Sequence, residues 1–270
     1  MKRRILTGLI VLSVAAVLLG CATTSSASTT PAATAPPQRT VVTGATVDQF
    51  LRDLRPAGTQ PVFLGVASRL RNRDEEEAVA ILHAAEQASR YVRMAARYQV
   101  VTQTSGRSLG VQDGIAAEWD ANLADRLVDS VNVLQVLQDA EGTYILATVD
   151  GIPPLPAIRI DPAGSGEPSW VRRPPEIAGF IVTTGVSLRS RRFRDSIDSA
   201  DQEALKEILS QTRSSVRMLE DRREVERQGT SMTTTVAQEA AATLRQFLVI
   251  SRHASADGRY YYSLVIAREE

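Results

Sequence analysis

Ten residues, Val182–Arg191, read VTTGVSLRSR and match an earlier stretch, Val62–Arg71, which reads VFLGVASRLR. Aligning Gly185 with Gly65 also brings two pairs of arginines into register. Both stretches are rich in β-branched and apolar residues, as is typical of a strand, and a long helical pattern follows each of them. Internal self-similarity of this kind predicts two units of the same architecture.

The ends of the two units match as well. Glu141-Gly142 and Asp257-Gly258 are turn sequences, and a tyrosine-containing run typical of a strand follows each turn. The alignment is offset by 120 residues at the two glycine strands and by 116 at the two turns, so the units have similar length. We call residues 41–152 the first copy and residues 176–270 the second copy.

In the first copy, the pattern predicts a strand over residues 62–68 and then a helix capped by Asn72, whose apolar residues recur at helical spacing. The remaining elements are a strand over 98–104, a glycine-containing loop over 106–114, a helix over 115–129, and strands over 131–137 and 144–149. Residues 47–54 are expected to form a short helix that caps this copy.

In the second copy, the pattern predicts a strand over residues 181–188 and a helix from Ser199, with Gln202 in its first turn, to about Leu219. Further elements are extended or paired strands over 222–235, a helix over 236–246, and strands over 247–252 and 260–267. The predicted fold class is therefore α+β: two tandem β-α-β-α-β-β modules, each a small, mostly antiparallel sheet with two helices on one face.

Residues 153–175, between the copies, contain seven prolines. Proline lacks a backbone N–H and disfavours both helix interiors and interior strands, so this segment is expected to be a linker. Trp170 is apolar enough to dock the linker against one of the copies.

The N-terminus has the pattern of an exported bacterial lipoprotein. Three basic residues precede an apolar run over residues 5–19, which is shorter than the roughly 20 apolar residues of a membrane span and matches a signal peptide over residues 1–20. The run ends in Leu18-Leu19-Gly20-Cys21. The small Gly20 suits cleavage before Cys21, whose thiol would take a diacylglyceryl group and whose freed amine would take an acyl chain.

Cys21 is the only cysteine, so no disulfide within one chain can form. Residues 21–40 are mostly Ser, Thr, Ala and Pro and are expected to be a disordered tether. Two lipid chains, at about 0.8 kcal/mol per buried CH₂, hold a protein stably on a membrane. No acidic residue follows Cys21 directly, which by resemblance to sorted lipoproteins favours the outer over the inner membrane.

Composition narrows the classes of function. The chain has 31 basic and 31 acidic residues, and loss of the signal peptide leaves a slight acidic excess, so nucleic-acid binding is not expected. The two histidines lie far apart, with no spacing typical of a zinc site. No phosphate-binding loop or nucleophile elbow occurs. We therefore expect neither catalytic residues nor a metal, and no cofactor besides the lipid on Cys21.

Two groups of residues are candidates for contact with a partner. The first is an arginine run: Arg189, Arg191, Arg192 and Arg194. It suits an anionic lipid headgroup, a phosphate or an acidic protein, or it is a solvated edge with Asp195 and Asp198 as neighbours. The second is Tyr260, Tyr261 and Tyr262, of which the first and third face one side of a strand and the second faces the other. One side should pack on the helices. The other side either presents aromatic rings to a partner or is the outer face of an amphipathic strand.

The lipobox, the glycine strand, the alanine-rich helix and the closing run Asp257–Val265 together resemble small bacterial envelope lipoproteins. That family is typified by the twenty-kilodalton outer-membrane lipoprotein and has relatives among flagellar outer-membrane lipoproteins. The resemblance is stronger over residues 178–270 than over 61–151, where one tyrosine stands in place of three. It implies a structural, non-enzymatic role in the cell envelope with other envelope proteins as partners, and it brings no catalytic residues.

Two other functions stay open at this point. One is a periplasmic carrier or binding module for lipid or peptidoglycan fragments, with its ligand in a groove between the modules. The other is an enzyme without a recognisable motif, which would need a pocket of converging ionisable groups with shifted pKa values.

Overall fold

The computed structural model describes residues 39–51, 54, 58–105, 108–158, 166–212, 217–223 and 233–270. Gly20, Cys21 and most of the tether lie outside these ranges, so the predictions made for them stay predictions. The folded part contains helices and mostly antiparallel sheets, which confirms the α+β class. Within the described residues, no helix combines the length and the apolar composition needed to cross a membrane.

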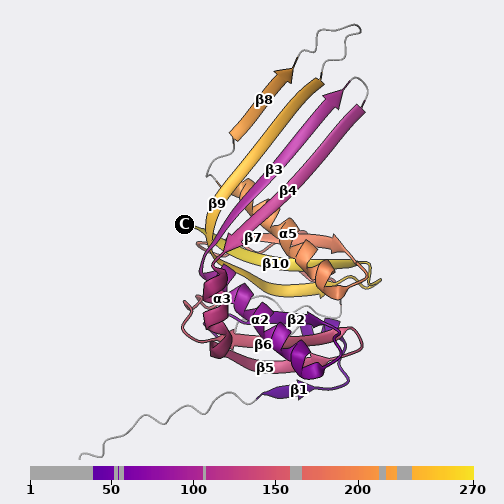
Figure 1. The fold of residues 1–270 in the computed structure, drawn as a ribbon, viewed down its shortest axis with the longest axis vertical. Helices are drawn as coiled ribbons and strands as arrows, with labels where there is room; N and C mark the ends of the chain where they lie inside the picture. The colour runs from indigo at the N-terminus through magenta and orange to yellow at the C-terminus, as the bar shows by residue number, and fades with distance from the viewer. Residues whose placement is uncertain are drawn as a thin grey trace, which may run out of the picture. The chain divides into compact units, whose positions relative to one another are not determined.

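The first sheet consists of residues from the first copy and of Thr40, the last residue of the predicted tether, which is in a strand (Figure 1). Its strand order is β1 (Thr40–Val42), β5 (Val131–Gln138), β6 (Gly142–Val149) and β2 (Phe63–Ser68). β1 pairs parallel with β5, and the other pairs are antiparallel. The long helix α2 (Arg73–Val92) packs on this sheet, and α3 (Ala121–Leu127) packs beside α2. Two short elements complete the copy: α1 (Val47–Leu51) and the 3₁₀ turn η1 (Val128–Ser130).

The second sheet combines both copies. Its strand order is β4 (Ser108–Trp119), β3 (Met94–Ser105), β9 (Thr233–Ala254), β10 (Tyr260–Glu269) and β7 (Ile181–Leu188), and β8 (Arg217–Arg223) also pairs with β9. All of these pairs are antiparallel. The hairpin β3–β4, which belongs to the first copy, therefore extends the sheet of the second. Helix α5 (Phe193–Gln211) packs on β7 and β10, and the short α4 (Ser169–Arg172) contacts β10.

The two copies make the same close contact between a strand glycine and a helix alanine. Gly65 lies directly under Ala80 of α2, and Gly185 lies in the same way under Ala200 of α5. A Cβ at either glycine would clash with the carbonyl oxygen of that alanine, so the close approach of helix and sheet needs glycine.

The register of the closing strands corrects the sequence alignment by two residues. Val66 pairs with Tyr144 in the first copy, and Val186 pairs with Tyr262 in the second. Tyr144 therefore corresponds to Tyr262, whereas the turn sequences had aligned it with Tyr260. The shift follows from the strand pairing, because each residue of an antiparallel ladder lies opposite one residue of the neighbouring strand.

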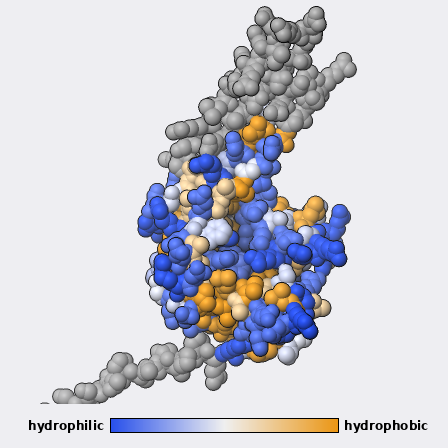
Figure 2. Space-filling view, in the orientation of Figure 1, coloured by the Kyte–Doolittle hydropathy of each residue, from blue (hydrophilic) through white to orange (hydrophobic). Residues whose placement is uncertain are grey.

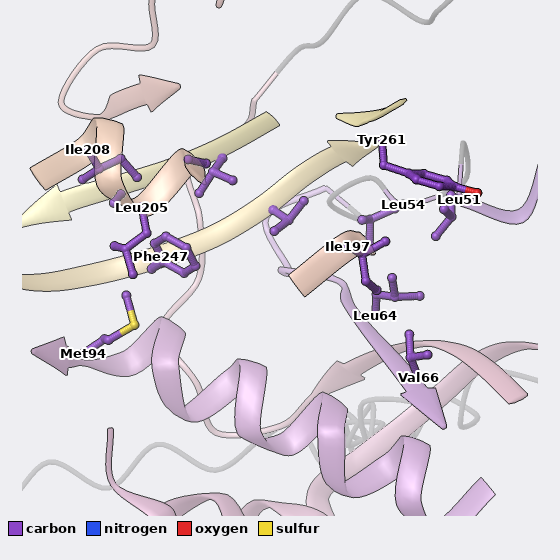
Figure 3. Packing of buried hydrophobic residues seen from close by; sticks show 14 of the residues in the cluster. Leu51, Leu54, Leu64, Val66, Met94, Ile197, Leu205, Ile208, Phe247 and Tyr261 are labelled. Carbon is purple, nitrogen blue, oxygen red and sulfur yellow. The ribbon is translucent and has the colours of Figure 1, made fainter. Parts of the chain in front are cut away.

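The two copies share their hydrophobic core. One cluster joins the face of the first sheet that carries Leu64, Val66 and Tyr144 to the apolar face of α5. Figure 3 shows Leu64 and Val66 beside Ile197 of α5. A second cluster joins α2 to Leu264 of the second sheet and to its neighbours. Residues 37–270 form one compact unit, so the predicted division into two modules is not confirmed.

The helix predicted over residues 236–246 is wrong, because this segment lies inside the 22-residue strand β9. Its alanines favour a helix by intrinsic propensity. In the structure Ala240, Ala242 and Leu244 are buried on one face at alternate positions. Pairing with β3 on one side and with β8 and β10 on the other overrides the local preference. Within the described residues, the second copy thus has one long helix on its sheet and not two.

Two other helix predictions need new boundaries. The helix predicted over 115–129 is restricted to α3 and η1, because residues 115–119 belong to β4 and the side chain of Asp120 accepts a hydrogen bond from the Leu123 N–H at 3.0 Å. The glycine-containing segment from residue 108 is likewise strand. Helix α5 begins at Phe193, before the predicted Ser199, and ends at Gln211.

Several predictions are confirmed. The side chain of Asn72 accepts a hydrogen bond from the Asp74 N–H at 3.0 Å and caps α2. β7 has its predicted bounds, and the strands predicted at 131–137 and 144–149 are β5 and β6. Residues 222 and 223 of β8 pair with β9, as expected of a strand pair in this region. In the linker, Trp170 is buried in the second cluster.

Candidate functional site

The structure divides the predicted arginine run. Arg194 lies in α5 and forms an ion pair of 3.5 Å with Asp198 one turn later. Arg189, Arg191 and Arg192 lie in the connection from β7 to α5 and are exposed. No carboxylate of the described residues forms an ion pair with these three. The run is therefore a cluster of three available guanidinium groups, to which Arg194 does not belong.

The three tyrosines alternate as predicted for a strand. Tyr261 is buried, and its ring packs edge-on against Phe193 at a centroid distance of 5.2 Å. Tyr260 and Tyr262 are half-buried and pair with Leu188 and Val186 of β7. Tyr262 also stacks on His253 at 6.0 Å. Tyr262 packs against the second hydrophobic cluster, so the face of Tyr260 and Tyr262 is only partly open, and it lies beside the two exposed apolar side chains of β7.

The arginine cluster and the partly open tyrosine face meet at β7, which is an edge strand of the second sheet (Figure 1). Val186 is 45% exposed and Leu188 is 65% exposed. Arg189 continues directly from Leu188, and its N–H donates to the carbonyl oxygen of Arg259 at 2.8 Å. The structure thus brings the two predicted groups together around one exposed strand edge.

In the equivalent strand of the first copy, β2, His83 binds one of the outward backbone groups. The N–H of Val66 donates to His83 Nδ1 at 3.0 Å, and His83 Nε2 lies 3.1 Å from the amide of Gln87. His83 is only 4% exposed. A ring nitrogen that accepts from an N–H carries no proton, so His83 is neutral with its proton on Nε2.

Burial, with smaller contributions from Arg194, Arg90 and Arg252, lowers the pKa of His83 to about 3. The unfolded chain binds this proton near pH 6.5. The buried, neutral His83 therefore costs no stability above pH 6.5. As the pH falls from 6.5 toward 3, the free energy of unfolding is expected to decrease by at most about 1.4 kcal/mol per pH unit. Urea unfolding at a series of pH values measures this slope.

The control for this prediction is His83→Gln, which keeps an acceptor but does not titrate. Between pH 6.5 and 4.5, its stability should depend much less on pH than the stability of the parent protein. An equal slope in this variant and in the parent protein would show that another group causes the acid sensitivity.

A pocket of about 280 Å³ lies where elements of the two copies meet. Its apolar wall consists of residues from β3, β4, α5 and β9: Met94, Ile115, Ala117, Trp119, Leu205 and Phe247. Its polar wall consists of residues from α2 and α5: Arg90, Asp198, Asp201 and Gln202. A pocket that is mostly apolar with a few polar groups is typical of small-ligand sites.

The polar groups of this pocket belong to a partly buried charge network. The guanidinium of Arg90 lies 3.7 Å above the ring of Trp119, and its Nε has no hydrogen-bond partner among the described residues. Asp201 accepts two hydrogen bonds from Arg252, at 2.9 and 2.8 Å. Burial, together with the neighbouring Asp201, raises the pKa of Asp198. Because these charges nearly balance, the pocket suits a small amphipathic molecule better than a highly charged one.

Sequence reasoning did not single out these pocket residues. Arg90, Trp119, Asp198 and Asp201 come from three elements that are distant in the chain, and no spacing links them. The described residues contain no group of three or more His, Cys, Asp or Glu side chains placed to hold a metal ion. Another surface feature is an apolar area over α2 (Figure 2), where Val79 and Leu82 are each 38% exposed.

No family model, curated protein or solved structure matches this chain.

Proposed function

We propose that this protein is a lipid-anchored component of the bacterial cell envelope that acts by binding other proteins and has no catalytic activity. The lipid on Cys21 holds it on a membrane, with the outer membrane favoured. The folded unit, which extends from residue 37 to residue 270, presents interaction surfaces at the end of the tether.

The observation that carries this proposal is the segment Leu18-Leu19-Gly20-Cys21 at the end of a basic and then apolar N-terminus. A cysteine has no packing role at the end of a signal peptide, whereas lipid transfer requires its thiol at that position. The interaction role draws support from the exposed edge of β7, with its apolar side chains and its three available arginines.

The lipid anchor is tested by Cys21→Ala in the native host. The parent protein is expected in the membrane fraction and to be released only by detergent, with a diacylglyceryl group on Cys21 by mass spectrometry. Cys21→Ala should carry no lipid and should lose this detergent-dependent behaviour, whereas the neighbouring Thr24→Ala should resemble the parent. An unmodified Cys21 in the parent protein would contradict the anchor.

The pocket favours a second candidate, a carrier or binding module for lipid or peptidoglycan fragments. Its position between the copies and its apolar wall suit part of such a fragment. Because Trp119 lines the pocket, its fluorescence should change when a fragment binds, and Trp119→Phe should remove that change. Saturable binding of a muropeptide or a lysophospholipid would support the carrier role.

A further inference from the structure

β7 has the composition of a strand that is open to pairing. Its sequence, Ile181–Leu188, contains no charged residue and no proline, although it is at the edge of its sheet. Edge strands normally carry charges, proline or a cover that prevents pairing with another chain. In the same sheet, the edges at β4 and β8 carry charges: Asp113 and Glu118 in β4, and five charged residues in β8. The edge strands β1 and β2 of the first sheet are uncharged, as β7 is. β7 therefore lacks the usual protection.

The ladder with β10 determines which backbone groups of β7 point outward. Arg189 and Arg259 form a hydrogen-bonded pair, and such pairs alternate along an antiparallel ladder. Gly185 and Ser187 therefore bond to β10, whereas Thr184, Val186 and Leu188 direct their N–H and C=O groups away from the sheet. Within the described part of the chain, no other backbone group pairs with these outward groups.

The internal repeat shows what a closed edge looks like in this fold. The outward N–H of Val66, which is equivalent to that of Val186, is taken by the buried His83. The position of α5 equivalent to His83 is Glu203, which instead forms an ion pair of 2.7 Å with Lys206. The outward N–H at this position is thus bound by a side chain in the first copy, whereas no described group binds it in the second.

The surroundings of this edge define the chemistry of a partner. Val186 and Leu188 are exposed on the same face as Tyr260 and Tyr262, so an added strand would find apolar neighbours there. Directly after Leu188 come Arg189, Arg191 and Arg192, which are exposed and have no carboxylate partner among the described residues. An acidic segment at this end would complement their charge.

We propose that β7 binds an extended segment of a partner protein as an additional strand. The segment runs antiparallel to β7, as all pairs of this sheet do, and has apolar side chains at alternate positions. Acidic residues precede the strand, because the N-terminal end of an antiparallel segment lies beside the arginines. This proposal rests on the interaction role proposed above, but it does not depend on the lipid anchor.

The test uses the processed protein in detergent micelles and a synthetic peptide of acidic residues followed by alternating valine and threonine. Amide hydrogen exchange is followed residue by residue. In the free protein the amides of Val186 and Leu188 should exchange fast, and saturating peptide should slow them by about tenfold or more. The amides of Gly185 and Ser187 are already paired with β10 and should change much less.

Two variants separate the backbone and the charge contributions. Val186→Pro removes an outward N–H and no ladder bond, so it should weaken peptide binding about tenfold or more while the thermal unfolding temperature stays near that of the parent. If this variant is destabilised, Leu188→Lys can be used instead. The lysine places a charge on the edge strand, which opposes pairing with another strand, so it should also weaken peptide binding. Arg191→Glu should weaken binding, whereas Arg71→Glu, at the equivalent position of the first copy, should not.

Four results would overturn the proposal. A slow Val186 amide in dilute free protein would mean that the chain itself covers the edge. Slowing that increases with protein concentration, together with a dimer in sedimentation, would assign the edge to a second copy. Slowing by vesicles containing phosphatidylglycerol, but not by peptide, would assign the arginines to a lipid surface. Peptide binding unchanged by Val186→Pro and Leu188→Lys would place the contact elsewhere. None of these results bears on lipid attachment to Cys21, which the fractionation experiment tests separately.

Discussion

The second copy, residues 176–270, is expected not to fold when it is produced alone. Its sequence predicts an independent module, but its core is completed by the first copy. The ring of Phe193 packs between Tyr261 of its own copy, at 5.2 Å, and Tyr144 of the first copy, at 5.4 Å. Removing the first copy would expose one side of this aromatic contact and the apolar face of α5.

The backbone of the second copy would also lose a partner strand. Residues 233–244 of β9 pair with all twelve residues of β3, which belongs to the first copy. Leu264 and Ile266, both fully buried, lie in the cluster that contains the alanine face of α2. Each buried Leu or Ile side chain contributes about 1.5–3 kcal/mol, and the net free energy of folding of a domain is only about 5–15 kcal/mol. Exposing several such side chains would therefore cost as much as the whole net stability of the domain.

Circular dichroism with urea titration checks this expectation. Residues 176–270 should give no cooperative transition, whereas residues 37–270 should unfold in one step as a single unit. Co-expression with residues 37–175 should restore the transition if the two copies form one core. A steep transition of residues 176–270 alone would contradict the shared core.

Glu76→Ala is expected to cost about 2 kcal/mol of folding free energy, through its lost hydrogen bonds to a charged group. The Glu76 side chain has no exposure to solvent, and it accepts from Arg69 at 2.7 Å and from Arg73 at 2.6 Å. It also accepts from the Leu70 N–H and from the Thr143 hydroxyl, each at 2.8 Å. Alanine would leave the fully buried Thr143 hydroxyl without its acceptor and would remove the acceptor of the partly exposed Arg69 and Arg73. This loss exceeds that of one surface ion pair.

The matched control is Glu77→Ala, on the next residue of the same helix. Glu77 pairs with Arg39, whose side chain is 48% exposed, so its loss should cost less than about 1 kcal/mol. Urea midpoints of the two variants give the comparison. Equal costs would show that the buried cluster around Glu76 does not stabilise the fold.

The protonation of Glu76 gives a second measurement of the same cluster. Burial raises the pKa of this carboxyl, but the hydrogen bonds from Leu70, Thr143 and Arg73 outweigh it and hold the pKa below its ordinary value. The charged form is thus the one that stabilises the fold, so this contribution is present above about pH 4.5 and is lost as the pH falls further. Glu76→Ala should lack this part of the acid sensitivity.

The corresponding position in the second copy shows how the duplicated units have diverged. Ser196 replaces Glu76, and its Oγ accepts from the Ser190 N–H at 2.8 Å, as Glu76 accepts from Leu70. The same backbone bond is retained with a smaller, uncharged side chain. In the first copy, Glu76 forms ion pairs with Arg69 and Arg73. The second copy has no carboxylate at this position, so the arginines that follow β7 do not form the equivalent ion pairs.

The sequence by itself determined those features whose cause is local. Asn72 caps α2 through a hydrogen bond two residues away, the strand β7 follows from β-branched residues, and Tyr260 to Tyr262 alternate because a strand has a period of two. The segment Leu18–Cys21 is likewise a local signal, on which the proposed lipid anchor depends.

Only the tertiary structure decided the features that depend on distant partners. The alanines of β9 favour a helix until β3, β8 and β10 pair with them, because ladder bonds and packing outweigh a propensity difference of less than about 1 kcal/mol per residue. The pocket beside Arg90 and Trp119 exists because the β3–β4 hairpin joins the other copy's sheet. The open edge of β7 could be recognised only by comparison with β2, since the equivalent strands differ in whether a distant histidine binds the outward N–H.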